Sequence, residues 1–233
     1  MLDKALEALK TYDWGQDPKT LSPIDEAIVA TYGNAEKRKE LEGQLAALLS
    51  TDATYDGKQT VCRYLMTIGT VASVPALAAL LTDEKLAHMG RYAIERNPAP
   101  EATAALRESL PKASGNLKIG LISSLGVRGD AASVAALAEL VGDGDTAVAT
   151  AAAYALGAIR TPEAAKAISL AKPDAKVQPA VTDASLACAE ALLAAGKNLD
   201  ALAIYKKFAG EGQPKHVRLA ATRGMLACAG KKE

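Results

Sequence analysis

Aromatic side chains are scarce in this chain of 233 residues: one Trp, one Phe and seven Tyr make up only 4% of it, although hydrophobic residues make up 49%. The core must therefore consist mainly of Ala, Leu, Val and Ile, which suit helices that stack closely. So few rings also leave little material for a pocket that would hold a large flat ligand.

Histidine is rarer still, because the chain has only His88 and His216, which lie far apart in the sequence. There is no HExxH motif, no His/Cys metal-ligand spacing and no Ser-His-Asp arrangement that the sequence can nominate. We interpret His88 as a partly exposed helix histidine rather than a catalytic residue. The sequence thus predicts that the protein is not an enzyme and has no catalytic residue, metal site or cofactor.

A net charge is also missing, since 27 basic and 27 acidic side chains cancel. This balance argues against a nucleic-acid binder or a protein that binds anionic membranes. The three cysteines, Cys62, Cys188 and Cys228, are too few and too scattered for a disulfide framework, and their odd number leaves one unpaired. We interpret all three as small core residues.

Long apolar runs are absent as well: no window approaches the roughly 18 apolar residues that a membrane span needs. The opening MLDKALEALK is charged throughout and lacks the apolar centre of a signal peptide. We therefore expect a soluble chain with no membrane insertion. Its compartment stays open between the cytoplasm and, if an export signal has been removed, the periplasm.

What the chain does contain is a pattern repeated three times between residues 84 and 171. Apolar positions recur every 31 residues, and a slightly shorter copy with Leu65 and Leu77 precedes them at 56–83. The recurring sets are Leu86, Leu117 and Val148; Ile94, Leu125 and Leu156; and Leu106, Leu137 and Ile168. A fixed period with two amphipathic segments per unit predicts an all-α fold, an α-solenoid of stacked antiparallel helix pairs.

The segments on either side of these repeats differ from them. Residues 1–55 predict an N-terminal helical capping region, in which Ser22 caps a helix and the charged run 36–42 faces water. Residues 56–175 hold the repeats. After Pro173 the interval between turns lengthens from 31 to 36 residues. Residues 176–233 therefore predict a longer hairpin and a closing helix in the same continuous solenoid.

Two short motifs carry a family resemblance. The segment AYALGAI at 153–159, followed by PEAA at 162–165, and the segment VPAL at 74–77 resemble HEAT repeats of the short bacterial kind also found in phycobilisome lyases. The segment ALLAAGKNLDALAIYKKFAGEGQ at 191–213 resembles a tetratricopeptide hairpin. Both resemblances imply a right-handed superhelix, and both are far more specific for the fold than for a function.

In HEAT repeats the second helix of each pair lines the concave side, which suits an extended protein partner or a flanking domain. Glu108 and Glu139 occupy the same place in successive second helices, and Arg128 and Arg160 lie in successive turns between helices. These four are our candidate binding residues. The alternative is that they are ordinary solvated charges.

Three further features have competing interpretations. Trp14 and Tyr12 either anchor a partner or pin the first helix onto the array. The turn 126–130 is expected to join two helices rather than to bind phosphate. Asp143 and Asp145 are similar to the start of a calcium loop, but the remaining ligands are missing, so Asp145 is expected to cap a helix.

Two functions remain from the sequence. The first is a non-catalytic protein-interaction scaffold, either free or as a module of a larger exported bacterial protein. The second, implied by the resemblance alone, is a tetrapyrrole (bilin) lyase or a chaperone-like binding protein of the lyase type. A deep pocket lined by Asp or Glu would favour the lyase, and a shallow groove would favour the scaffold.

Overall fold

A computed structural model describes residues 1–230 and confirms the predicted all-α fold of α-solenoid class. The described residues form fourteen α-helices and four short 3-10 helices, with one isolated β-bridge between Trp14 and Gln16 and no strand. Within the same range no helix is long and apolar enough to cross a membrane. The chain divides into two compact units, Met1–Leu121 and Ile122–Glu233. The domain boundaries predicted near residues 55 and 175 stay a prediction.

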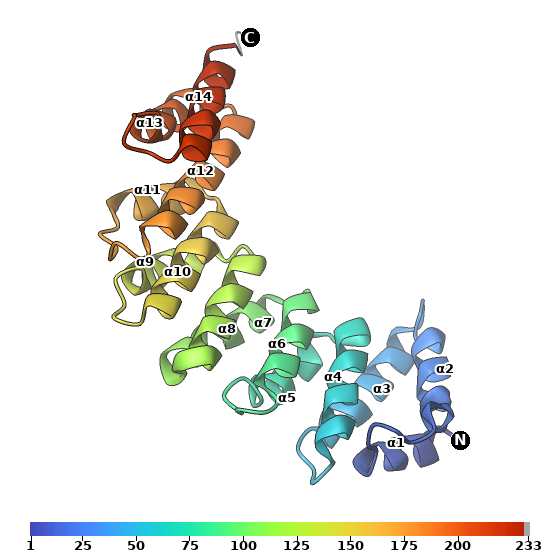
Figure 1. The fold of residues 1–233 in the computed structure, drawn as a ribbon. Helices are drawn as coiled ribbons and strands as arrows, with labels where there is room; N and C mark the ends of the chain where they lie inside the picture. The colour runs from blue at the N-terminus through green and yellow to red at the C-terminus, as the bar shows by residue number, and fades with distance from the viewer. Residues whose placement is uncertain (231–233) are drawn as a thin grey trace. The chain divides into compact units, whose positions relative to one another are not determined.

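In the first unit, pairs of helices pack in the order of the sequence. It contains α1 (Leu2–Lys10), α2 (Ser22–Ala30), α3 (Ala35–Leu48), α4 (Tyr55–Ile68), α5 (Val74–Ala78), α6 (Ala87–Arg96), α7 (Pro100–Ser109) and the start of α8 (Gly115–Val127). Helix α4 packs on α3 and α6, while α5 packs on α6 and α7. Each pair thus covers the apolar face of its neighbour (Figure 1).

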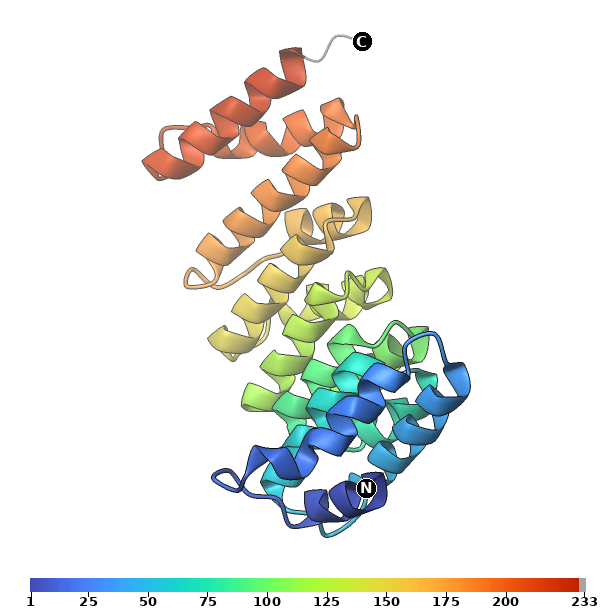
Figure 2. The same ribbon diagram turned by 90° about the vertical axis from the view of Figure 1, so that its right-hand side faces the viewer.

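The second unit repeats this arrangement with longer helices toward the C-terminus. It contains the end of α8, then α9 (Val134–Leu140), α10 (Thr146–Ile159), α11 (Pro162–Leu170), α12 (Gln178–Ala194), α13 (Asn198–Phe208) and α14 (Lys215–Gly230). In Figure 2, the yellow and orange helices α10 and α12 form one layer of this unit, and α9 and α11 form the other. Helix α13 packs against both α12 and α14.

The repeated apolar positions form the cores of both units. The repeated apolar residues are buried both in the first helix of each pair and in the second. These residues are Leu65, Ile94, Leu125 and Leu156 in the first helices, and Leu77, Leu106, Leu137 and Ile168 in the second. The register predicted from the 31-residue period is therefore confirmed at these eight positions. Leu117, in the first turn of α8, is only half-buried.

Glycines after two of these core leucines explain how closely the first helices approach in the second unit. A Cβ atom built on Gly126 would lie 2.9 Å from the Cα of Ala155, and one on Gly157 would lie 2.8 Å from the Cα of Ala184. Both distances are too short for a methyl group. The Leu-Gly pair of the repeat thus combines a buried anchor with the missing side chain that close packing requires.

Two local predictions for the first 55 residues were wrong. Ser22 lies inside α2 and makes no capping hydrogen bond; the cap is Asp17, whose carboxylate accepts from the backbone N–H of Lys19 (3.0 Å) and starts a 3-10 helix, Pro18–Leu21, that runs into α2. The aspartate and the proline that follows it supply the same start signal one turn earlier.

Glu42 is the second correction, because it does not face water with the rest of the run 36–42. Only 1% of it is exposed, and its carboxylate accepts from the N–H of Thr70 (2.6 Å), the hydroxyl of Thr70 (2.8 Å) and the N–H of Ser73 (3.0 Å). These donors lie at the start of a short 3-10 helix, Val71–Ser73, whose first N–H groups need acceptors. A buried carboxylate is tolerated here because charge-assisted hydrogen bonds replace its water.

Candidate functional site

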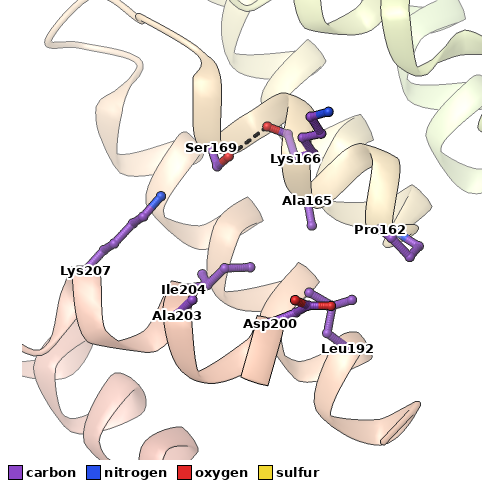
Figure 3. A pocket seen from close by; sticks show the side chains of 9 residues that line it. All are labelled: Pro162, Ala165, Lys166, Ser169, Leu192, Asp200, Ala203, Ile204 and Lys207. Carbon is purple, nitrogen blue, oxygen red and sulfur yellow. Dashed lines mark hydrogen bonds between the residues drawn. The ribbon is translucent and has the colours of Figure 1, made fainter. Parts of the chain in front are cut away.

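Two adjoining cavities lie between α11 and α13 in the second unit, and together we call them the α11/α13 groove (Figure 3). The larger has a volume of about 350 Å³. It is lined by Pro162, Ala165, Lys166 and Ser169 from α11, by Leu192 from α12, and by Asp200, Ala203, Ile204 and Lys207 from α13. Facing second helices of successive repeats thus form its two walls.

The groove exists because the second helices are not evenly packed. Helix α9 packs directly on α11, and in the first unit α5 packs on α7, but α11 and α13 are not in comparably close contact. Helix α12, which joins them, has 17 residues where α10 has 14, and the segment 171–177 precedes it. The longer repeat therefore separates α13 from α11 and leaves a gap that side chains only partly fill.

The smaller cavity, which we call the side pocket, has a volume of about 120 Å³. Ala165, Ser169, Ile204 and Lys207 line both cavities, so the side pocket opens from the larger one. Its lining combines buried apolar side chains, which include Ile168, Val181 and Phe208, with the polar side chains of Ser169, Gln178, Ser185 and Lys207. The hydroxyl of Ser185 already donates to the carbonyl of Val181 (2.7 Å), so its proton is not free for a ligand.

The polar groups of the groove are distributed unevenly. Lys166 and Lys207 stand on opposite walls, whereas Asp200 lies in the first turn of α13. None of the three forms an ion pair within the part of the chain that the structure describes. The hydroxyl of Ser169 donates to the carbonyl of Lys166 (2.8 Å), as Figure 3 shows. All four side chains are exposed, so their charges and hydroxyl are available to a ligand.

The four residues nominated from the sequence do not line this groove. Glu108 is exposed on α7 in the first unit, and Glu139 is exposed on α9 in the second. Arg128 is half-buried just after α8. Arg160 has a left-handed backbone (φ 57°) at the end of α10, and its Nε donates to the carbonyl of Gly157 (3.1 Å). Their role in binding stays a prediction.

The cysteines are buried and unpaired, which confirms them as core residues. Burial raises the pKa of the Cys62 thiol to about 12. Burial also raises the pKa of Cys188 to about 11, against an opposing effect from Arg160. Both thiols stay protonated at neutral pH, so neither is activated as a nucleophile.

The two histidines lie in different units. His88, on α6, stacks against Tyr92 with 6.5 Å between ring centroids, and its Nδ1 lies 3.3 Å from a guanidinium nitrogen of Arg91. His216 is the second residue of α14 and is exposed, as is His88. The expectation that His88 is an exposed helix residue is confirmed.

The acidic segment before α10 forms a helix cap, as predicted. The carboxylate of Asp145 accepts from the N–H of Ala147 (2.8 Å), and the carboxylate of Asp143 accepts from the N–H of Asp145 (2.8 Å). The turn 126–130 joins the end of α8 to a short 3-10 helix, Ala131–Ser133, with Gly129 in the left-handed region (φ 64°). Neither feature needs a ligand to explain it.

Trp14 is held by α4, although 55% of it is exposed. Its Nε1 donates to Gln59 (3.2 Å), its N–H donates to Asp56 (3.0 Å), and the guanidinium of Arg63 lies 5.1 Å from its ring centroid. Tyr12 is buried beside it, with 6.4 Å between the ring centroids. These contacts support the interpretation that the pair pins the first helix onto the array.

Asp13, which precedes Trp14 in the same loop, should make the stability of the protein depend on pH. A hydrogen bond that protonated Asp13 makes to Asp56, then desolvation and charge repulsion by Asp56, raise the pKa of the Asp13 carboxyl above its ordinary value of 3.8. The folded state therefore keeps a proton that the unfolded state has released, so stability falls as pH rises above 3.8 through the raised pKa. Asp13→Asn should remove this loss. Melting temperatures measured from pH 3 to pH 7 should rise for the variant relative to the wild type as the pH increases. A difference in melting temperature that does not change with pH would contradict the raised pKa of Asp13.

Comparisons with known proteins support the repeat assignment. Residues 101–185 match the model of a family described as HEAT repeats, which confirms that resemblance for this stretch. No curated protein matches the sequence significantly.

Several solved structures are similar at low identity. An engineered protein is 20% identical with a TM-score of 0.47, and the alignment covers 98% of this chain and 68% of that one. Human deoxyhypusine hydroxylase in complex with glycerol is 18% identical (TM-score 0.39, covering 98% and 96%). A computationally designed armadillo repeat protein for modular peptide recognition is 16% identical (TM-score 0.39, covering 97% and 99%).

Proposed function

We propose that this protein is a non-catalytic protein-interaction scaffold, and that its α11/α13 groove binds an extended segment of a partner protein or of a flanking domain. The observation that carries this proposal is the gap between two second helices, where the neighbouring pair α9 and α11 is closed. An open interval between otherwise regular repeats leaves apolar surface, including the exposed Pro162 and Ala203, for a ligand to cover.

The lining of the groove suits a peptide chain. Its floor is aliphatic, while Lys166, Ser169, Asp200 and Lys207 supply polar groups at its edges. Sites that bind with specificity combine an apolar surface with a few placed polar groups. The position of the groove also supports the sequence-based proposal that second helices provide the binding face.

A lyase that acts on a tetrapyrrole is not favoured by this geometry. The larger cavity, at about 350 Å³, is at the low end of the range for drug-sized ligands, and no aromatic side chain lines it. Its acid, Asp200, is exposed rather than enclosed. These are features of a shallow groove, which was the outcome expected for a scaffold.

Finer features of the proposal come from the sequence. The short bacterial HEAT pattern supports a bacterial protein, with the chain acting alone or as a module of a larger exported one. The hairpin of α12 and α13 resembles a tetratricopeptide unit, and it would provide the wall that differs from the HEAT repeats before it. Glu108, Glu139, Arg128 and Arg160 are proposed as additional contacts outside the groove.

Blocking the groove should weaken binding. A library of random linear peptides displayed on phage would be selected on the wild-type protein, and enriched peptides would be synthesised and measured by fluorescence polarisation. Ser169→Phe places a ring at the junction of the two cavities and should weaken these peptides by at least about tenfold, which equals about 1.4 kcal/mol.

Leu170→Phe is the matched control, because Leu170 is 68% exposed, adjacent in sequence and outside the lining of both cavities. It should leave affinity unchanged, as should His88→Ala and His216→Ala. A library that yields no binder, or binders that tolerate Ser169→Phe, would rule out the groove as the docking site. Loss of binding in either histidine variant would instead favour a site centred on that residue.

A further inference from the structure

We propose that the α11/α13 groove selects segments in which an aliphatic side chain and an acidic side chain lie close together, with the aliphatic group in the side pocket and the carboxylate beside Lys207. This inference rests on the proposed function and adds the chemistry of the partner. It is carried by the size of the side pocket and by the placement of the unpaired charges around its mouth.

The side pocket has room for one aliphatic side chain. Its volume of about 120 Å³ corresponds to about four water-sized groups of roughly 30 Å³ each, which matches the four carbons of a Leu or Ile side chain. Ile168, Val181 and Phe208 line its walls and are buried. Transfer of a Leu or Ile side chain from water into such a site is favourable, whereas a charged side chain would lose its hydration there.

The mouth of this pocket is positively charged. Lys207 lines both cavities, so its side chain stands where the pocket opens into the groove, and Lys166 stands on the facing wall. No carboxylate of the described chain pairs with either ammonium group. A carboxylate from a partner would bring the negative charge that the groove lacks at this end and could accept a hydrogen bond from Lys207.

Asp200 gives the groove a direction. It precedes Lys207 by seven residues on α13, which is about 10 Å along a helix. An extended peptide covers that distance with about three residues. The acidic residue of the partner therefore belongs at the Lys207 end. A second acid about three positions toward Asp200 would be repelled, and a basic or neutral polar residue is expected there.

Charge reversal on α13 tests this specificity. The probes are the peptides enriched on the wild-type protein, made with acetylated N-termini and amidated C-termini so that only side chains carry acid. Replacing either the aliphatic or the acidic residue of such a peptide by alanine should weaken binding about tenfold. Lys207→Glu should weaken the acidic peptides by a similar factor, and a new selection on this variant should enrich Lys or Arg in place of the acid.

Lys206→Glu is the matched control, since it makes the same charge change one residue away on α13, at an exposed side chain outside both cavities. It should leave affinity and selection unchanged. Peptides that are blocked by Ser169→Phe but show no aliphatic-acidic preference would overturn this inference and leave the scaffold in place. Equal effects of Lys207→Glu and Lys206→Glu would also overturn it, because they would indicate attraction by general charge. Binders that tolerate Ser169→Phe would overturn both proposals.

Discussion

Replacing Leu125 with alanine should lower the free energy of unfolding by about 2 to 5 kcal/mol. Leu125 is fully buried, and it occupies the first-helix core position that recurs as Leu65, Ile94 and Leu156. The substitution removes apolar contacts and leaves a cavity that stacked helices cannot close, because the Gly126 backbone already touches Ala155. Thermal and urea unfolding followed by circular dichroism would measure the loss.

Val127→Ala is the matched control for this variant. Val127 lies two residues further along the same helix, but 69% of it is exposed. Its truncation should change stability by no more than about 0.5 kcal/mol. If Leu125→Ala had the same melting temperature as the wild type, the 31-residue register would be wrong.

Glu42→Ala should cost about 3 kcal/mol, which is large for a residue in a charged run. The substitution removes an acceptor that serves the N–H and hydroxyl of Thr70, which are partly buried, and the N–H of Ser73, which is buried, so all three donors would lose their partner. Unfolding measured as above would show the loss. Glu40→Ala on the same helix removes an exposed carboxylate and should have little effect. Equal stabilities of the two variants would contradict the capping role.

The contrast between Leu125 and Glu42 shows what the sequence could predict about the fold. Leu125 belongs to a periodic set, and periodicity reports directly which face of a helix is apolar. Glu42 sits among charges that do face water, so the local pattern assigns it to the surface. Its partners lie 28 and 31 residues further along the chain. Only the packing of α3 on the 3-10 helix Val71–Ser73, which follows α4, brings them together.

The groove was harder to predict than the fold for a related reason. Repeat symmetry drew attention to equivalent positions such as Glu108 and Glu139, whereas the groove lies where the repeat lengthens. The signal was present in the sequence as the change from a 31-residue to a 36-residue interval. That change predicts an irregular junction, but which side chains border the gap depends on how far α13 is displaced from α11.

The gap beside α11 also affects how the second unit opens. Helix α13 packs closely on α12 and α14, but its side toward α11 borders the groove, so α13 and α14 are held to the rest of this unit mainly through α12. Such segments exchange their amide hydrogens through local unfolding at a lower free energy than the core. A segment bound in the groove at 100 times its dissociation constant would raise that opening free energy by about 2.7 kcal/mol. Binding at one wall of the groove would thus protect backbone amides throughout α13 and α14 from hydrogen exchange, including amides of residues that the partner never contacts.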